Sequence, residues 1–222
     1  MAESNKTYHR SLFLSGPAGR LEALLWTSAE ARPAMSALVC HPHPLYGGTM
    51  HNKVVFQAAK SLHRLGLPVL RFNFRGAGLS EGEHDHGRGE REDVRCAIDF
   101  LAAEFPGAPV VLAGFSFGAS VGLSVGVADA RVTRLVGIGI PVGAWDFSFL
   151  RESTKPKLFV VGTEDEFAEQ ERVKDLVASL KEPKRLVMVE GADHFFAGKL
   201  DQVDRAIREW LGKAGAGKVG EN

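Results

Sequence analysis

A serine between two glycines lies where an apolar run changes into a helical pattern. Ser116 is the centre of Gly114–Gly118 (GFSFG), which follows the apolar run 110–113 and precedes small, helix-compatible residues. This order predicts a strand, a sharp turn and a helix, with the serine hydroxyl projecting above the sheet. Glycines without a Cβ suit the two positions where strand and helix come closest around the serine. In a chain with 25 glycines the pentapeptide alone is weak evidence, and the strand-turn-helix context gives it weight.

An acid and a histidine complete a possible nucleophilic set. A serine hydroxyl is a poor nucleophile until a base takes its proton, and that base needs an orienting carboxylate. Asp165 lies in the segment 162–166 (GTEDE) and His194 in the segment 191–194 (GADH), each just after a predicted strand. The chain therefore offers a nucleophile, an acid and a base in that order.

The acid has competitors in the sequence. Glu164 and Glu166 flank Asp165, and Asp146 follows the preceding predicted strand. Any of these carboxylates could equally be a charge on a solvated loop. Asp193 adjoins the histidine, but neighbouring residues rarely point the same way, so we interpret it as a turn residue.

The segments around these residues alternate between strand and helix. Apolar runs predict strands at 37–40, 68–74, 110–113, 135–140, 157–161 and 185–189, after an opening hairpin at 12–26. Helical spacing predicts helices at 52–65, 94–105, 120–128, 167–180 and up to 211. Strands that are apolar throughout indicate a mostly parallel sheet, here of about eight strands, with helices on both faces: an α/β fold. Function in such sheets lies at the carboxyl ends of the strands.

Composition limits the protein's class and partners. A chain of 222 residues predicts one domain, 1–211, with a disordered tail at 212–222. The 27 basic and 27 acidic residues balance, which argues against nucleic acid or an anionic membrane as partner. The first residues lack an apolar segment and no run reaches membrane-spanning length, so we expect a soluble, cytoplasmic monomer or homodimer. Two cysteines, Cys40 and Cys96, form no metal-ligand spacing and favour packing roles.

Two other motifs suggest ligands that we do not favour. His-x-His pairs at 41–43 and 84–86 invite a metal interpretation, but no carboxylate or cysteine completes a ligand set. The glycine-rich segment 75–82 has Glu81 where a dinucleotide fingerprint needs its third glycine. We therefore expect neither a metal nor a cofactor.

The loop 41–48 (HPHPLYGG) is the place to look for donors to an oxyanion. Attack by a serine creates an oxyanion that needs fixed hydrogen-bond donors. One donor is expected to be the amide of Phe117, and another an amide from the loop after the early strand. Pro42 and Pro44 have no amide hydrogen. Three candidate donors remain in the loop: His43, Leu45 and Tyr46.

The order serine, acid, histidine and the motifs together resemble the α/β-hydrolase superfamily over about residues 20–211. The chain is most similar to small bacterial serine hydrolases without a lid, related to dienelactone hydrolases and carboxylesterases. The resemblance is carried by HPHPLYGG at 41–48, NFRGAGLS at 73–80 and GFSFG at 114–118. Dienelactone hydrolase proper uses a cysteine nucleophile, so a serine favours ester chemistry.

The resemblance also implies residue roles. Ser116 would be the nucleophile, Asp165 the acid and His194 the general base. Some relatives place the acid after the preceding strand, where Asp146 lies here. The loop resembles the His-Gly-x-Pro oxyanion loop of epoxide hydrolases, which indicates His43 as the second donor and leaves Leu45 in reserve.

The expected function is hydrolysis of a small carboxylic ester through an acyl-enzyme on Ser116. The same set of residues could cleave a thioester, a lactone or an amide, as in a peptidase. A non-catalytic binding module on the same fold is an alternative of another class, although loss of a catalytic residue, its usual sign, is not seen.

The sequence also predicts an open pocket. The connection 141–156 is too short for a helical cap, so aromatic side chains must form the roof. The candidates are Tyr46, Phe115, Phe117, Trp145, Phe147, Phe149 and either Phe195 or Phe196, and we assign Tyr46, Phe115, Trp145 and Phe196 to the pocket. A shallow cleft offers little surface against which to bury a chain. We therefore expect a preference for short acyl groups, acetyl to about hexanoyl, since each buried methylene contributes only while there is a wall beside it.

Overall fold

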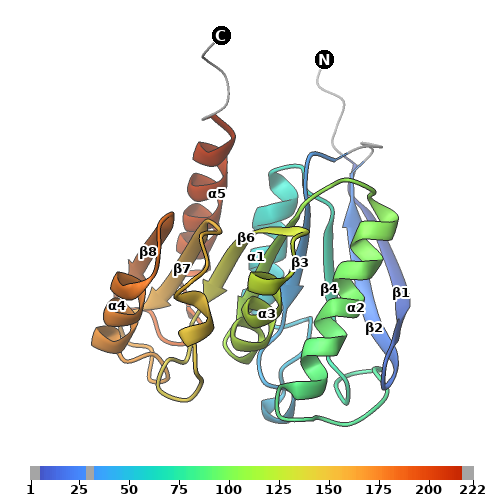
Figure 1. Ribbon diagram of the computed structural model, residues 1–222, viewed down its shortest axis with the longest axis horizontal. Coiled ribbons are helices and arrows are strands. Elements are labelled where there is room, and N and C mark those ends of the chain that lie inside the picture. The colour runs from blue at the N-terminus through green and yellow to red at the C-terminus, as the bar shows by residue number, and fades with distance from the viewer. Residues whose placement is uncertain (1–5, 29–32, 217–222) are drawn as a thin grey trace.

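The computed structural model describes residues 6–28 and 33–216. Its centre is an eight-stranded sheet in the order β1-β2-β4-β3-β5-β6-β7-β8 (Figure 1). The strands are β1 (Tyr8–Gly16), β2 (Gly19–Thr27), β3 (Ser36–Cys40), β4 (Val69–Phe72), β5 (Val110–Phe115), β6 (Val132–Ile138), β7 (Lys157–Gly162) and β8 (Lys184–Val189). β1 and β2 form the expected hairpin and β2 pairs antiparallel with β4, whereas the remaining pairs are parallel.

Helices cover both faces of the sheet, as the apolar strands require. The helices are α1 (Lys53–Arg64), α2 (Arg88–Glu104), α3 (Phe117–Ala128), α4 (Gln170–Ser179) and α5 (Leu200–Ala216). One apolar cluster joins α1 and α5 to one face, and a second joins α2, α3 and α4 to the other (Figure 1). β3, β4, β5 and β7 are buried along their whole length because they are covered from both sides.

The order of the strands brings two loops together. The chain leaves β3 for β4 on one side and returns to β5 on the other, so the direction of winding reverses between β3 and β5. Cys40 pairs with Gly114 at the ends of these two strands. The loop that starts at His41 and the turn that holds Ser116 therefore leave the sheet side by side, at the switch point where α/β sheets bind ligands.

Two predictions concern the segments at the edges of the site. The connection between β6 and β7 contains a single 3₁₀ turn, η2 (Ser148–Leu150), and no cap, as expected. The prediction of disorder from residue 212 is wrong for its first part, because α5 continues to Ala216; the remainder of that tail, 217–222, lies outside the described residues.

No helix in the ranges 6–28 and 33–216 could cross a membrane. The cytoplasmic location and the oligomeric state stay predictions.

Candidate active site

Ser116 occupies a strained turn between β5 and α3. Its φ of 54° and ψ of −121° lie in a region that non-glycine residues rarely adopt. Its amide donates to the carbonyl of Ile138 on the neighbouring strand, which fixes the turn against the sheet. A Cβ on Gly114 would collide with the carbonyl oxygen of Gly118, and one on Gly118 with that of His41. Both flanking glycines are thus required by close approach of the backbone, as the sequence predicted.

The structure brings together the three residues expected to form the catalytic set. His194 Nε2 lies 3.0 Å from Ser116 Oγ. On its other side, His194 Nδ1 lies 2.9 Å from each carboxylate oxygen of Asp165. A ring whose Nδ1–H donates to the carboxylate leaves Nε2 free to accept the serine proton. This is the geometry that general-base activation of a hydroxyl requires.

Packing holds the imidazole in this orientation. His194 is buried, and Phe115 lies against its ring with the centroids 4.9 Å apart. Phe167 contacts the same ring edge to face at 4.8 Å, and its amide donates to Asp165 Oδ1. Gly139 lies next to the ring, where a Cβ would come within 3.2 Å of Cε1. The histidine therefore has little freedom to turn away from the serine.

The other carboxylates named from the sequence are engaged elsewhere. Asp146 is exposed and accepts hydrogen bonds from the amide and hydroxyl of Ser148. Asp193 accepts from the amide of Ala197, which is the turn role expected of it. Glu164 and Glu166 are exposed. Among these acids only Asp165 contacts the histidine.

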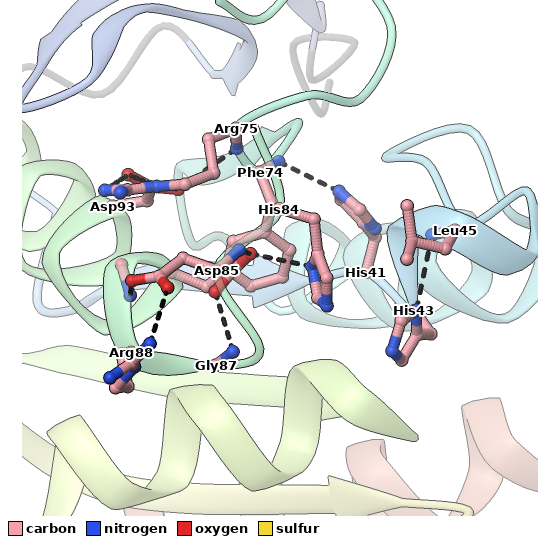
Figure 2. Close-up of polar contacts among 12 residues, drawn as sticks. His41, His43, Leu45, Phe74, Arg75, His84, Asp85, Gly87, Arg88 and Asp93 are labelled. Atoms are coloured by element: carbon pink, nitrogen blue, oxygen red, sulfur yellow. Dashed lines mark hydrogen bonds and ion pairs between the residues drawn. The ribbon is translucent and has the colours of Figure 1, made fainter. Parts of the chain in front are cut away.

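Backbone hydrogen bonds distinguish the candidate oxyanion donors. The amide of Leu45 donates to Nδ1 of its neighbour His43 (Figure 2), and that of Tyr46 donates to the His43 carbonyl. The amides of His43 and Phe117 have no acceptor within the described part of the chain. The reserve donor, Leu45, is therefore occupied, and His43 and Phe117 are the pair available to an oxyanion.

His41 fixes the peptide group that carries the His43 amide. Its Nε2 accepts a hydrogen bond from the amide of Phe74 at 2.9 Å, so the ring proton is on Nδ1 (Figure 2). That Nδ1–H donates to the carbonyl of Pro42 at 2.6 Å. Burial lowers the pKa of His41 to about 3, so the ring is neutral at ordinary pH. In a trans peptide the carbonyl and the next N–H point in opposite directions, so holding the Pro42 oxygen also aims the His43 amide.

Rings fill the space on the side of His43 and Phe117. The His43 ring lies 4.8 Å from that of Phe117 and 4.7 Å from that of His84, and Trp145 packs edge to face on Phe117 at 5.2 Å. Figure 2 shows His84 and His43 extending toward each other from separate loops. Burial, and secondarily His84, lowers the pKa of His43. We call these four residues the ring cluster.

A buried carboxylate supports this cluster from behind. Glu90 accepts from the amides of Asp85 and Gly87, which ties the loop to the start of α2. His84 Nδ1 lies 2.8 Å from Glu90 Oε1, although the two groups are not aligned for a hydrogen bond. Within the residues described, no group of three or more metal-ligating side chains occurs, so neither His-x-His pair has the ligand set of a metal site.

The expected pocket residues fall into two kinds. Trp145 is half-buried against the ring cluster, and Tyr46 is exposed beside His43. Phe115 is fully buried, so its assignment as a pocket residue is wrong: it supports His194 from below. Phe196 is also fully buried, yet it borders a cavity on the far side of Phe195. The sequence did not predict that cavity, because it is formed by the starts of α1 and α5, which are distant in the chain.

Comparisons with known proteins agree with this geometry. A family model described as an alpha/beta hydrolase domain matches residues 36–210. An uncharacterized protein of Rickettsia prowazekii is 38% identical over 209 residues, covering 90% of this chain and 87% of the relative.

Two solved structures are similar over nearly their whole length. One is a serine hydrolase without a lid from Xanthomonas campestris, with a TM-score of 0.84 and 38% identity over 92% of this chain and 94% of that one. The other is an alpha-beta serine hydrolase homologue from Coxiella burnetii, with a TM-score of 0.85 and 37% identity over 91% and 97%. The chain belongs to the alpha/beta hydrolase family, and its similarity within it is to serine hydrolases without a lid.

Proposed function

We propose that the protein hydrolyses small carboxylic esters through an acyl-enzyme formed on Ser116. The observation that carries the proposal is the continuous contact from Asp165 through His194 to the serine oxygen, next to two amides with no other acceptor. His194 would take the serine proton as Oγ attacks the ester carbonyl, and the amides of Phe117 and His43 would receive the oxyanion. Asp165 would hold the imidazole in the required tautomer.

The remaining steps follow from the same groups. Collapse of the tetrahedral intermediate breaks the bond to the alcohol, whose oxygen takes the proton from His194. A water molecule activated by the same histidine then attacks the acyl-enzyme and releases the acid. The pathway needs no cofactor.

The geometry also supports a preference for short acyl groups. The ring cluster of His43, His84, Phe117 and Trp145 occupies the space beside the two oxyanion amides, and the connection between β6 and β7 adds no cap. A long acyl chain would find little apolar wall there, so its methylenes would add little binding energy. We expect kcat/KM for p-nitrophenyl esters to peak between acetyl and about hexanoyl, with no activation at a lipid-water interface.

Ser116→Ala tests the proposal. The variant should fold, because the hydroxyl supports no core packing, and should lose all but a residual ~10³-fold to 10⁴-fold advantage over water. Wild-type protein should show a burst of p-nitrophenol and a single adduct on Ser116 with a phosphonyl fluoride. A folded variant that kept more than a few percent of the wild-type rate would refute the assignment. Absence of any burst in the wild type would favour a binding module instead.

A further inference from the structure

A cavity of about 620 Å³ lies between the start of α1 and the loop that follows His194. This volume is within the range of small-molecule sites. Its lining includes Thr49, His51, Lys53, Phe195, Phe196 and Leu200. None of these residues belongs to the catalytic set or to the ring cluster.

The cavity is next to the catalytic histidine. The Phe195 ring packs edge to face on the His194 ring with the centroids 5.3 Å apart, and the same phenylalanine lines the cavity. Phe195 is 53% exposed, so its ring lies at the surface between the histidine and the cavity. The lining also includes Gly47, in the loop that carries the amide of His43. A group bound to the serine could pass over Phe195 and enter the cavity.

Its wall contains a strained residue. Only three non-glycine residues in the described ranges have a positive φ: His86, Ser116 and Phe196. Phe196 adopts a φ of 54° while its side chain is fully buried. Its carbonyl accepts from the amide of Lys199, and the turn is closed by Asp193. Strain of this kind persists where the surroundings over-determine a geometry, and it gathers at functional sites.

The lining has an apolar and a basic part. Phe195, Phe196 and Leu200 provide apolar surface, and Thr49 and His51 provide polar groups at the edge. Lys53 brings a positive charge and forms no ion pair with any residue in 6–28 or 33–216, and no carboxylate lines the cavity. Such a lining suits a ligand with an apolar stem and a negatively charged end.

We propose that this cavity binds the alcohol part of the ester, and that the preferred alcohol carries an anionic group at its far end. The assignment rests on the proposed function. His194 must protonate the leaving oxygen, so the alcohol lies on the histidine side, where Phe195 leads into the cavity. The ring cluster restricts the acyl side. The substrate class is therefore a short acyl group on an amphiphilic, anionic alcohol, cleaved by water into a short acid and an ω-hydroxy acid.

Acetyl esters of ω-hydroxy acids with two to eight carbons test this assignment. The controls are acetyl esters of the matching ω-hydroxy amides, which have the same length and no charge. Release of acetate gives kcat/KM for each. In the wild type the carboxylate should exceed the amide by about threefold to tenfold at the length that reaches Lys53, because an ion pair at a half-open site gains little more than an exposed one. At shorter lengths the ratio should approach one.

Two variants and one control locate the effect. Lys53→Gln should reduce the carboxylate-to-amide ratio to about one at every length. Lys60→Gln is the matched control, since it removes a charge from the same helix at a residue that does not line the cavity, and it should keep the wild-type ratio. Leu200→Trp should fill the cavity and lower the ratio of hexyl acetate to methyl acetate hydrolysis.

Some outcomes would overturn the inference and leave the proposed function standing. The first is an equal kcat/KM for the carboxylate and amide compounds in the wild type, and the second is a carboxylate preference that survives Lys53→Gln. The third is a ratio of hexyl acetate to methyl acetate hydrolysis that Leu200→Trp does not change. In each case the protein would still hydrolyse p-nitrophenyl acetate. A protein that hydrolysed no ester and gave no adduct on Ser116 would instead refute the proposed function.

Discussion

The two sides of Ser116 are built in opposite ways. On one side His41, itself buried, holds the Pro42 carbonyl by a hydrogen bond, and rings pack above the amide of His43. On the other side a cavity of about 620 Å³ begins behind a half-exposed Phe195. The first side has hydrogen bonds and little space, whereas the second has space and few hydrogen bonds.

This difference corresponds to the two tasks that the proposed hydrolysis of an ester would combine. Donors to an oxyanion act best when they are fixed before the reaction, because reorganising them costs free energy in the transition state. A leaving group needs room to enter and depart, and its variable part is recognised by surface and charge. The loop after β3 would therefore hold the oxyanion donor, and the loop after β8 would border the space for the leaving group.

Replacement of His41 should have the largest effect, because it removes the hydrogen bond that holds the loop with the His43 amide. His41→Leu removes the donor to the Pro42 carbonyl, so the His43 amide loses its fixed direction, and kcat should fall by about 10²-fold, as for loss of one oxyanion donor. KM should change little, because the ground-state ester hardly uses the oxyanion amides. Steady-state kinetics with p-nitrophenyl acetate measure both.

A conservative variant and a matched control separate this effect from simple loss of stability. The amide nitrogen of Asn matches the position of Nδ1, so His41→Asn should recover most of the lost kcat. Phe72 packs on Phe74, whose ring contacts His41, so Phe72→Leu should lower the free energy of unfolding without the loss in kcat. If His41→Leu and Phe72→Leu lowered kcat equally, His41 would have a structural role only.

Trp145→Ala should make the two sides more alike. Loss of the indole that packs on Phe117 opens the acyl side, and the longest acyl group accepted should grow by about two to four carbons, each worth ~0.8 kcal/mol once a wall is available. The dependence on alcohol length should stay as in the wild type. A set of p-nitrophenyl esters and a set of alkyl acetates report the two dependences. An unchanged acyl profile would mean that the ring cluster does not limit the acyl group.

The buried imidazole should also make the stability of the protein depend on pH. The pKa of His41 is about 3 in the folded protein, below its ordinary value near 6.5, so the unfolded chain binds the proton first. The free energy of unfolding should then fall as pH drops from about 6.5, by at most about 1.4 kcal/mol per pH unit, and level off near the folded pKa. Urea titrations between pH 7 and 4 should show a shallower slope for His41→Asn. Parallel curves for the two proteins would contradict the assignment of this imidazole as neutral.

The sequence by itself determined what depends on neighbours along the chain. The strand, turn and helix around Ser116 follow from an apolar run, two glycines that the backbone contacts require, and small residues after them. The positions of Ser116, Asp165 and His194, each after a predicted parallel strand, were enough to predict that they meet at one edge of the sheet. Because proline has no amide hydrogen, the sequence also excluded Pro42 and Pro44 as donors in the loop 41–48.

The tertiary structure decided what depends on contacts between distant segments. The choice between His43 and Leu45 depends on a side chain that folds back onto its own loop and occupies one amide. The burial of Phe115 depends on α5 and the loop after β8 covering its strand. The cavity depends on how α1 and the strained turn at Phe196 face each other. Apolar periodicity indicates that a residue is buried, but not against which partner, so these features required the packed molecule.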